Sequence, residues 1–252
     1  MVPAVFIHGG RCTGAIWSRT TPLLPGRSLA VDLPGRNDPT GHATANFSGW
    51  AEAVASDMDA AGIDRAVLVG HSMGGGTLAA MARLFPERVA AVIYFSAVVP
   101  PNGRPFLEGL SEQQQAYMRS NREAGVVTLP RSPVGEVETL SSDRAFVSAA
   151  QSSEALGPFF EPVSLEGLAS TKVGFVKLLR DRSIEPDRQD LFITRLREIG
   201  PCAVREVAAN HMAMANSPAA SAEAIQSMIA GFELIPGPWG RGLVPNPIAI
   251  GK

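Results

Sequence analysis

The sequence is poor in the residue types that mark several functional classes. Of its 252 residues only 18% are charged and the formal net charge is -2, so nothing indicates binding to nucleic acid or to an anionic membrane surface. No apolar run approaches the ~20 residues of a membrane-spanning helix. The two cysteines, Cys12 and Cys202, are far apart and fit no metal-binding spacing, which favours a reduced setting over a disulfide framework.

Other absences bear on the cellular setting. The residues after Met1 enter a predicted strand at once, without the basic segment and long apolar stretch of a signal peptide, so we expect a cytoplasmic protein. The chain has no internal repeat, and its length suffices for one large domain, with or without an insertion. The oligomeric state stays open, with a homodimer as one option.

The most informative stretch runs from Gly70 to Gly74 and has the pattern G-x-S-x-G around Ser72. The apolar run 66–69 predicts a buried strand before it, and the Ala- and Leu-rich segment 77–84 predicts a helix after it. A strand that turns straight into a helix strains its apex residue, and glycines two positions away leave room for that turn. The context predicts a serine nucleophile, whereas the alternative is a glycine-rich turn with an incidental serine.

Strands and helices alternate over the first hundred residues in the order βαβαβαβ, and the alternation returns after residue 172. This order predicts the α/β class, with a mostly parallel sheet and helices on both of its faces. The predicted strands are 4–7, 28–31, 66–69, 89–95, 173–179 and 203–207, and the predicted helices are 16–24, 47–61, 77–84, 187–199 and 218–229.

Three regions follow from this pattern. Residues 1–98 and 173–232 form the predicted core. Residues 99–172 hold seven prolines and scattered aromatic residues, and we interpret them as a mostly helical lid inserted at the carboxyl edge of the sheet. Residues 233–252 hold four prolines and four glycines, which is typical of an irregular tail.

A serine nucleophile needs a base, and the four histidines allow a choice by elimination. His8 ends the first strand before two glycines, His42 lies in a polar loop and is interpreted as solvated, and His71 should point away from the serine that follows it. His211 follows the last predicted strand by a short loop, at the edge where sites form in parallel sheets. We therefore predict His211 as the base, with a structural histidine as the alternative.

The acid that orients the base should follow another strand, and Asp181 does. Its alternative role is an ion pair with Arg180 or Arg182 on a surface turn. The competing acids lie at or inside the next helix and are typical of helix N-terminal charges; they are Glu185, Asp187 and Asp190.

The oxyanion formed when Ser72 attacks a carbonyl needs fixed hydrogen-bond donors. The Met73 backbone N–H at the helix start is one candidate, and the Gly10 N–H just after the first strand is the other.

These features together resemble the α/β-hydrolase superfamily up to about residue 232, and within it the plant-type methylesterase and hydroxynitrile lyase group. The resemblance implies the same roles for Ser72, Asp181 and His211, in the chain order of that fold, and for the Gly10 and Met73 amides. It rests on His8-Gly9-Gly10 with Trp17, Asp32-Leu33-Pro34-Gly35, Gly70-His71-Ser72-Met73-Gly74-Gly75, Leu179-Arg180-Asp181-Arg182-Ser183-Ile184 and Asn210-His211-Met212.

Differences from related enzymes at three positions favour ester hydrolysis over other reactions of the fold. Its lyases carry a threonine and a lysine where this chain has Gly9 and Met212, which favours the esterase branch. Related dehalogenases and epoxide hydrolases use a carboxylate where this chain has Ser72.

We therefore predict a cofactor-independent serine hydrolase, with no metal, that cleaves a small carboxylic ester through an acyl-enzyme. The substrate is expected to be methyl-ester-like with an apolar or aromatic acyl part, because Met and aromatic residues are frequent in the insertion and near His211, although such residues are more often simply core. Two alternatives remain on the same fold. One is a lyase, a cyclase or a cofactor-free oxygenase, and the other is a small-molecule receptor.

Overall fold

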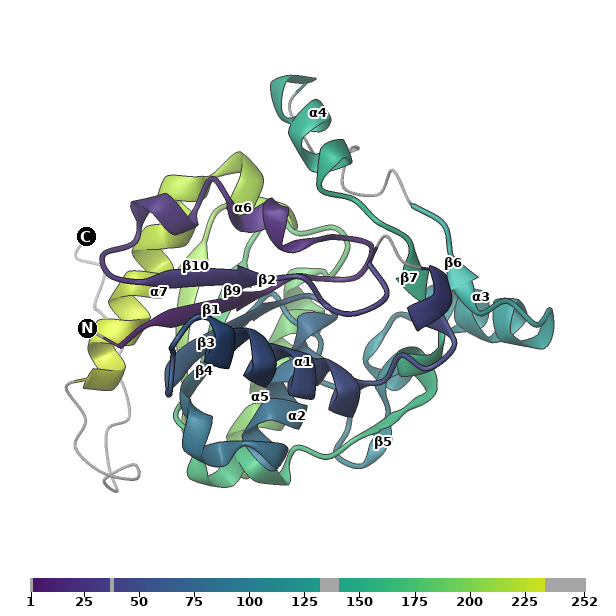
Figure 1. Ribbon diagram of the computed structural model, residues 1–252, viewed down its shortest axis with the longest axis horizontal. Coiled ribbons are helices and arrows are strands. Elements are labelled where there is room, and N and C mark those ends of the chain that lie inside the picture. The colour runs from purple at the N-terminus through teal and green to yellow at the C-terminus, as the bar shows by residue number, and fades with distance from the viewer. Residues whose placement is uncertain (1, 37–38, 132–140, 234–252) are drawn as a thin grey trace, which may run out of the picture.

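Six parallel strands form the centre of the molecule in the computed structural model (Figure 1), which describes residues 2–36, 39–131 and 141–233. The strand order is β10-β9-β4-β3-β1-β2, and every neighbouring pair is parallel. The predicted parallel sheet is therefore confirmed, and the strand that precedes Ser72 lies near its middle. The bounds are β1 Ala4–Ile7, β2 Ser28–Val31, β3 Ala66–His71, β4 Val89–Phe95, β9 Val173–Leu178 and β10 Cys202–Val207.

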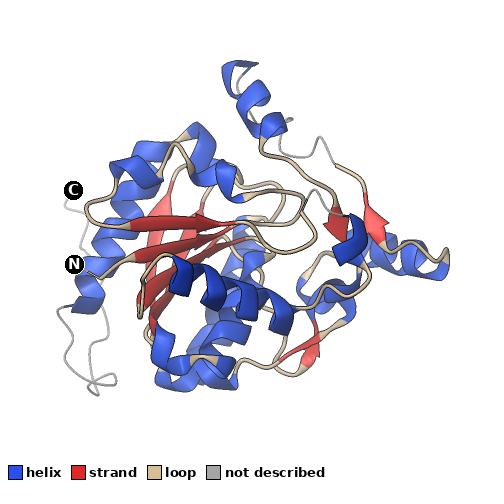
Figure 2. Ribbon diagram, viewed as in Figure 1, coloured by secondary structure: helices blue, strands red, loops and turns tan. Residues whose placement is uncertain are grey.

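Helices cover both faces of this sheet, as Figure 2 shows. Successive side chains of a strand point to opposite faces, so Leu68 of β3 enters one hydrophobic core while Val67 and Val69 enter the other. The first core is closed by α1 (Phe47–Ala60), α2 (Gly74–Leu84) and α5 (Pro186–Ile199), and the second by α6 (Ala213–Asn216) and α7 (Pro218–Glu233).

The helix predicted over 16–24 is wrong. The chain forms two short 3-10 turns instead, at Gly14–Trp17 and Thr21–Leu23. Pro22 lies in the second turn and has no backbone N–H to donate, so a continuous helix cannot run through it.

The insertion contains more than helices. It has α3 (Glu112–Glu123) and α4 (Ser141–Ala149), and also two antiparallel strand pairs that the sequence did not predict. The pairs are β5 (Arg104–Pro105) with β8 (Pro162–Val163) and β6 (Thr128–Leu129) with β7 (Glu154–Ala155). Figure 1 shows α3, β6 and β7 together at one end of the molecule. The division into core and lid at residues 99–172 remains a prediction.

Two further expectations concern the chain as a whole. No helix within the described ranges is both long enough and apolar enough to cross a membrane. The predicted tail, apart from its first residue, lies outside the described residues.

Candidate active site

Ser72 occupies the sharp turn between β3 and α2. Its φ of 51° lies in the left-handed region, which residues other than glycine rarely adopt. A Cβ atom on Gly70 would lie 2.7 Å from Leu78 Cγ, and one on Gly74 would lie 3.1 Å from the His8 carbonyl oxygen. The glycines therefore permit the close approach of strand and helix that their spacing predicted, and the turn presents Ser72 at its apex.

The helix after Ser72 begins at Gly74, three residues earlier than predicted. A Cβ atom on Gly75 would lie 2.3 Å from the Val98 carbonyl oxygen, so only glycine allows α2 to pack this closely against the chain after β4. The early start makes Met73 the N-cap residue of α2. The peptide that carries the Met73 N–H thus lies at the positive end of the helix dipole.

The structure brings Asp181 and His211 together. His211 Nδ1 lies 2.7 Å from Asp181 Oδ2, and Asp181 is 2% exposed. The same oxygen accepts a hydrogen bond from the Ser96 hydroxyl at 2.7 Å. Oδ1 accepts the backbone N–H groups of Ser183 and Ile184, both at 2.8 Å. All four hydrogen bonds hold the carboxylate, and hence the imidazole, in one orientation.

These contacts determine the charge state of Asp181. Burial alone would raise the pKa of its carboxyl group, but His211, the Ile184 N–H and the Ser96 hydroxyl together lower that pKa below its ordinary value. Asp181 therefore carries its negative charge at neutral pH. A charge at this place stabilises the imidazolium that forms when His211 takes up a proton.

Sequence reasoning missed Ser96. It follows β4 directly, is fully buried and has a φ of 40°, so it is a second strained serine at the carboxyl edge of the sheet. The signal that could have identified it is a small polar residue directly after a buried strand.

His71 and His8 are both neutral structural histidines. His71 Nε2 lies 3.0 Å from the His211 carbonyl oxygen, and burial is the main reason that its pKa lies well below the ordinary value. His8 Nδ1 donates to the Gly9 carbonyl while Nε2 accepts the Leu33 N–H. Burial lowers the pKa of His8 to about 3. Both ring nitrogens of His8 are therefore engaged, whereas His71 is held through Nε2 and its Nδ1 has no hydrogen-bond partner among the described residues.

The interpretation of His42 as a solvated loop residue is wrong. Its side chain is 2% exposed, and its Nε2 lies 3.1 Å from the Ser153 hydroxyl oxygen. Ser153 belongs to the insertion, so His42 is bound by a residue that lies far along the chain.

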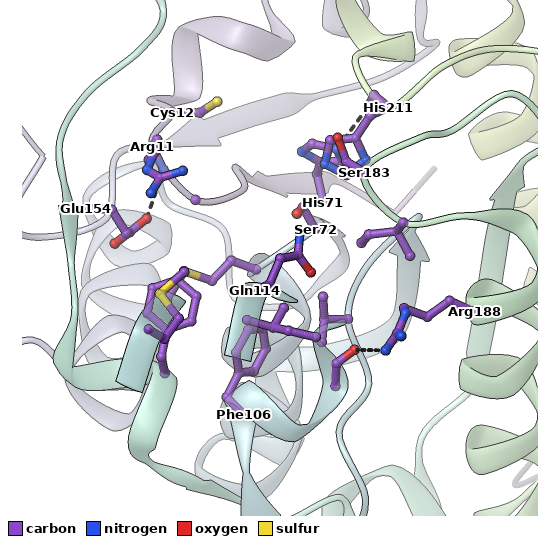
Figure 3. Close-up of a pocket in the computed structure, with 18 of the residues that line it drawn as sticks. Arg11, Cys12, His71, Ser72, Phe106, Gln114, Glu154, Ser183, Arg188 and His211 are labelled. Carbon is purple, nitrogen blue, oxygen red and sulfur yellow. Dashed lines mark hydrogen bonds between the residues drawn. The ribbon is translucent and has the colours of Figure 1, made fainter. Parts of the chain in front are cut away.

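Four of the five predicted site residues line one cavity of about 150 Å³ (Figure 3), namely Gly10, Ser72, Met73 and His211. Asp181 does not line it, but it binds His211, Ser183 and Ile184, which do. Much of the remaining wall is apolar and comes from the insertion and its flanks, chiefly Val98, Phe106, Leu110, Met118 and Phe159. The polar part of the wall includes Arg11, Gln114, Glu154 and Arg188.

Across the part of the chain that the structure describes, no group of three or more His, Cys, Asp or Glu side chains is arranged to hold a metal ion.

The parallel sheet with its strained serine turn defines an α/β-hydrolase, and the chain belongs to the alpha/beta hydrolase family, whose model matches residues 4–224. Within that family it is similar to a pyrethroid hydrolase from Sphingobium wenxiniae, with 33% identity over 39% of this chain and 37% of the relative. It is also similar to putative methylesterase 11 from Arabidopsis thaliana, with 23% identity over 75% of this chain and 54% of the relative. The matched stretches thus span about half, or less, of these relatives' lengths.

Solved structures show the same fold. An extracellular alpha/beta-hydrolase from a Paenibacillus species superimposes with a TM-score of 0.77 at 20% identity, covering 90% of this chain and 99% of that one. At this identity the likeness establishes the architecture.

Proposed function

We propose that this protein is a carboxylic ester hydrolase that works through an acyl-enzyme on Ser72. One observation carries the proposal. A serine in a left-handed turn shares a cavity with His211, whose Nδ1 is bound to the buried Asp181 carboxylate. The similarity to proteins named pyrethroid hydrolase and methylesterase supports ester cleavage.

The proposed mechanism assigns a role to each of these residues. His211 Nε2 takes the proton of Ser72 as its oxygen attacks the ester carbonyl carbon, while Asp181 holds the Nδ1–H and stabilises the imidazolium. The backbone N–H groups of Gly10 and Met73 stabilise the oxyanion. His211 then returns the proton to the departing alcohol. Water, activated by the same imidazole, releases the acid.

The cavity supports a small substrate with an apolar or aromatic acyl part. Its volume of about 150 Å³ is roughly five times the ~30 Å³ that one water molecule takes up in the liquid, which suits a small organic ester. The rings of Phe106 and Phe159 and the side chain of Met118 form an apolar wall for the acyl group. A methyl ester has the smallest leaving group and is the first substrate to test. The cytoplasmic location remains a prediction from the sequence, and the oligomeric state stays open, with a homodimer as one option.

Hydrolysis of a chromogenic short-chain ester by the wild type and by Ser72→Ala tests this function. We expect a burst of alcohol release from the wild type, and a loss of at least ~10³-fold in kcat for the variant, by analogy with the removal of other triad serines. Turnover that survives the loss of the hydroxyl would favour the cofactor-free oxygenase, which uses the histidine–acid pair without the serine. Binding without turnover in the wild type would favour a receptor.

A further inference from the structure

Three residues other than glycine have a positive φ within the described ranges, and all three lie at the proposed active site. Ser72 (51°) carries the nucleophile and Ser96 (40°) binds the acid. The third is Arg11, with a φ of 58°, and it directly follows the oxyanion donor Gly10. Backbone strain of this kind persists where the surroundings fix it and is concentrated at functional sites. Nothing in the triad explains the strain at Arg11.

The insertion holds the backbone of Arg11 from both sides. The Arg11 N–H donates to Glu154 Oε2 at 2.9 Å, and the Arg11 carbonyl accepts the Ser152 N–H at 2.8 Å. The contact continues along the chain, because the Thr13 N–H donates to the Ala150 carbonyl at 2.9 Å. Figure 3 shows Glu154 and Arg11 bonded on one wall of the cavity that contains Ser72.

Glu154 is itself fixed by a buried ion pair. Its Oε1 lies 2.5 Å from Arg36 Nη1, and the two side chains are only 1% and 2% exposed. Arg36 also donates to the Ser153 carbonyl, and its guanidinium lies 5.1 Å from the centre of the Trp50 ring. Arg36, which belongs to the predicted core, therefore fixes the position of the Glu154 carboxylate and balances its charge, although Glu154 itself belongs to the insertion.

The carboxylate also lies next to the expected oxyanion site. A Cβ atom on Gly10 would lie 3.3 Å from Glu154 Oε2 and 3.4 Å from Met73 Sδ, so the glycine lies between the two. A negative charge here would oppose the developing oxyanion unless a cation balanced it. The Arg36 guanidinium supplies that balance and leaves the carboxylate free to accept the Arg11 N–H.

We propose that Glu154 is a positioning residue for the oxyanion hole. By binding the Arg11 N–H it fixes the Gly10–Arg11 peptide in the left-handed turn, and this orients the preceding Gly10 N–H toward the carbonyl oxygen of the substrate. The insertion thus completes the oxyanion hole as well as covering the cavity. The inference rests on the proposed function, since it takes Gly10 as an oxyanion donor.

Two double variants isolate the hydrogen-bond acceptor from the charge pair. Both Arg36→Met/Glu154→Gln and Arg36→Met/Glu154→Met remove the two buried charges, but only the first keeps a side-chain oxygen that can accept the Arg11 N–H. We expect the Met variant to have a kcat at least tenfold below that of the Gln variant, with KM values within about threefold. We expect at least tenfold in kcat because losing one oxyanion donor entirely lowers the rate by ~10²–10³-fold, and a misoriented donor should lose a part of that. Inhibition by an alkyl boronic acid, which forms a tetrahedral adduct with serine, should weaken by a similar factor.

Equal kcat and equal boronate inhibition in the two double variants would overturn the inference. If the Met variant does not fold, Glu154→Asp replaces it, since it keeps the charge but withdraws the oxygen from Arg11. A kcat at least tenfold below the wild type then supports the inference, and an unchanged kcat overturns it. The wild type and Ser72→Ala are measured alongside. A wild type that does not hydrolyse the ester, or that hydrolyses it no faster than Ser72→Ala, would contradict the proposed function, whereas normal wild-type turnover with equal double variants contradicts only the role of Glu154.

Discussion

Removal of the Ser96 hydroxyl tests how Asp181, the acid of the proposed triad, is held. In Ser96→Ala, Asp181 keeps its other hydrogen bonds but loses the donor at 2.7 Å on the oxygen that also faces His211. Asp181 is 2% exposed, so water cannot easily replace the lost donor. A hydrogen bond to a charged group contributes about 1.5–3 kcal/mol. For a protein of this size each kcal/mol shifts Tm by about 2–4 °C, so we expect Tm to fall by roughly 3–12 °C.

The loss should depend on pH in a defined direction. The pKa of Asp181 lies below its ordinary value in the folded protein, so its stabilising contribution is present above the unfolded pKa of about 4 and is lost as pH falls through the folded value. The stability difference between wild type and Ser96→Ala should therefore be largest at neutral pH and shrink in acid. Urea denaturation at pH 7 and near pH 3.5 measures this difference.

The same substitution should affect turnover. If the whole 1.5–3 kcal/mol is also lost from the transition state, kcat falls by roughly 10- to 150-fold.

Ser221→Ala is the matched control. Ser221 is also fully buried, but its hydroxyl has no hydrogen-bond partner among the described residues, so its removal should leave stability unchanged or slightly raised. Equal effects of the two substitutions, or a Ser96→Ala loss that is the same at both pH values, would refute the reasoning.

Three further predictions follow from the same geometry. Asp181→Asn should lower kcat by about 10⁴-fold with little change in KM, because the amide favours the wrong imidazole tautomer, and steady-state kinetics measure this. His8 has a folded pKa of about 3 against an ordinary 6.5, so the unfolded chain binds one more proton between these values and stability is lost as pH falls from 6.5 toward 3. His8→Gln should remove up to about 1.4 kcal/mol per pH unit from that slope in denaturation curves, and an unchanged slope would contradict the assignment. Gly75→Ala should lower the free energy of unfolding by about 1–3 kcal/mol, since its Cβ would lie 2.3 Å from the Val98 carbonyl oxygen. Gly231→Ala in α7, with no atom within 4 Å of the added methyl group, should be neutral or stabilising, and denaturation of both variants checks the contrast.

The parts of the structure that the sequence predicted are those specified by local pattern. Four of the six strands, β1, β3, β4 and β9, are short apolar runs that are buried along nearly their whole length, so their composition alone identified them, whereas β2 and β10 are partly exposed. The turn at Ser72 was recognisable because its glycines are required by close backbone contacts. Asp181 and His211 could be selected because each follows a strand at the same edge of the sheet.

The parts that were missed depend on contacts between distant segments. His42 is buried and contacts Ser153 of the insertion, and nothing in the sequence around either residue indicates that contact. Glu154 begins a two-residue strand, which is too short to give a periodic pattern, and its partner Arg36 lies in a polar loop. Long-range pairs of this kind leave no trace in a single sequence.

The most direct test of the account is to locate the acyl group after an acid quench. The wild type is mixed with a short-chain ester during the burst, quenched, digested and analysed by mass spectrometry. We predict that the peptide containing Ser72 gains the mass of the acyl group and that fragmentation places it on the Ser72 side chain, with no such gain in Ser72→Ala. An ester-cleaving wild type with no acylated peptide, or with the acyl group on another residue, would contradict the proposed mechanism.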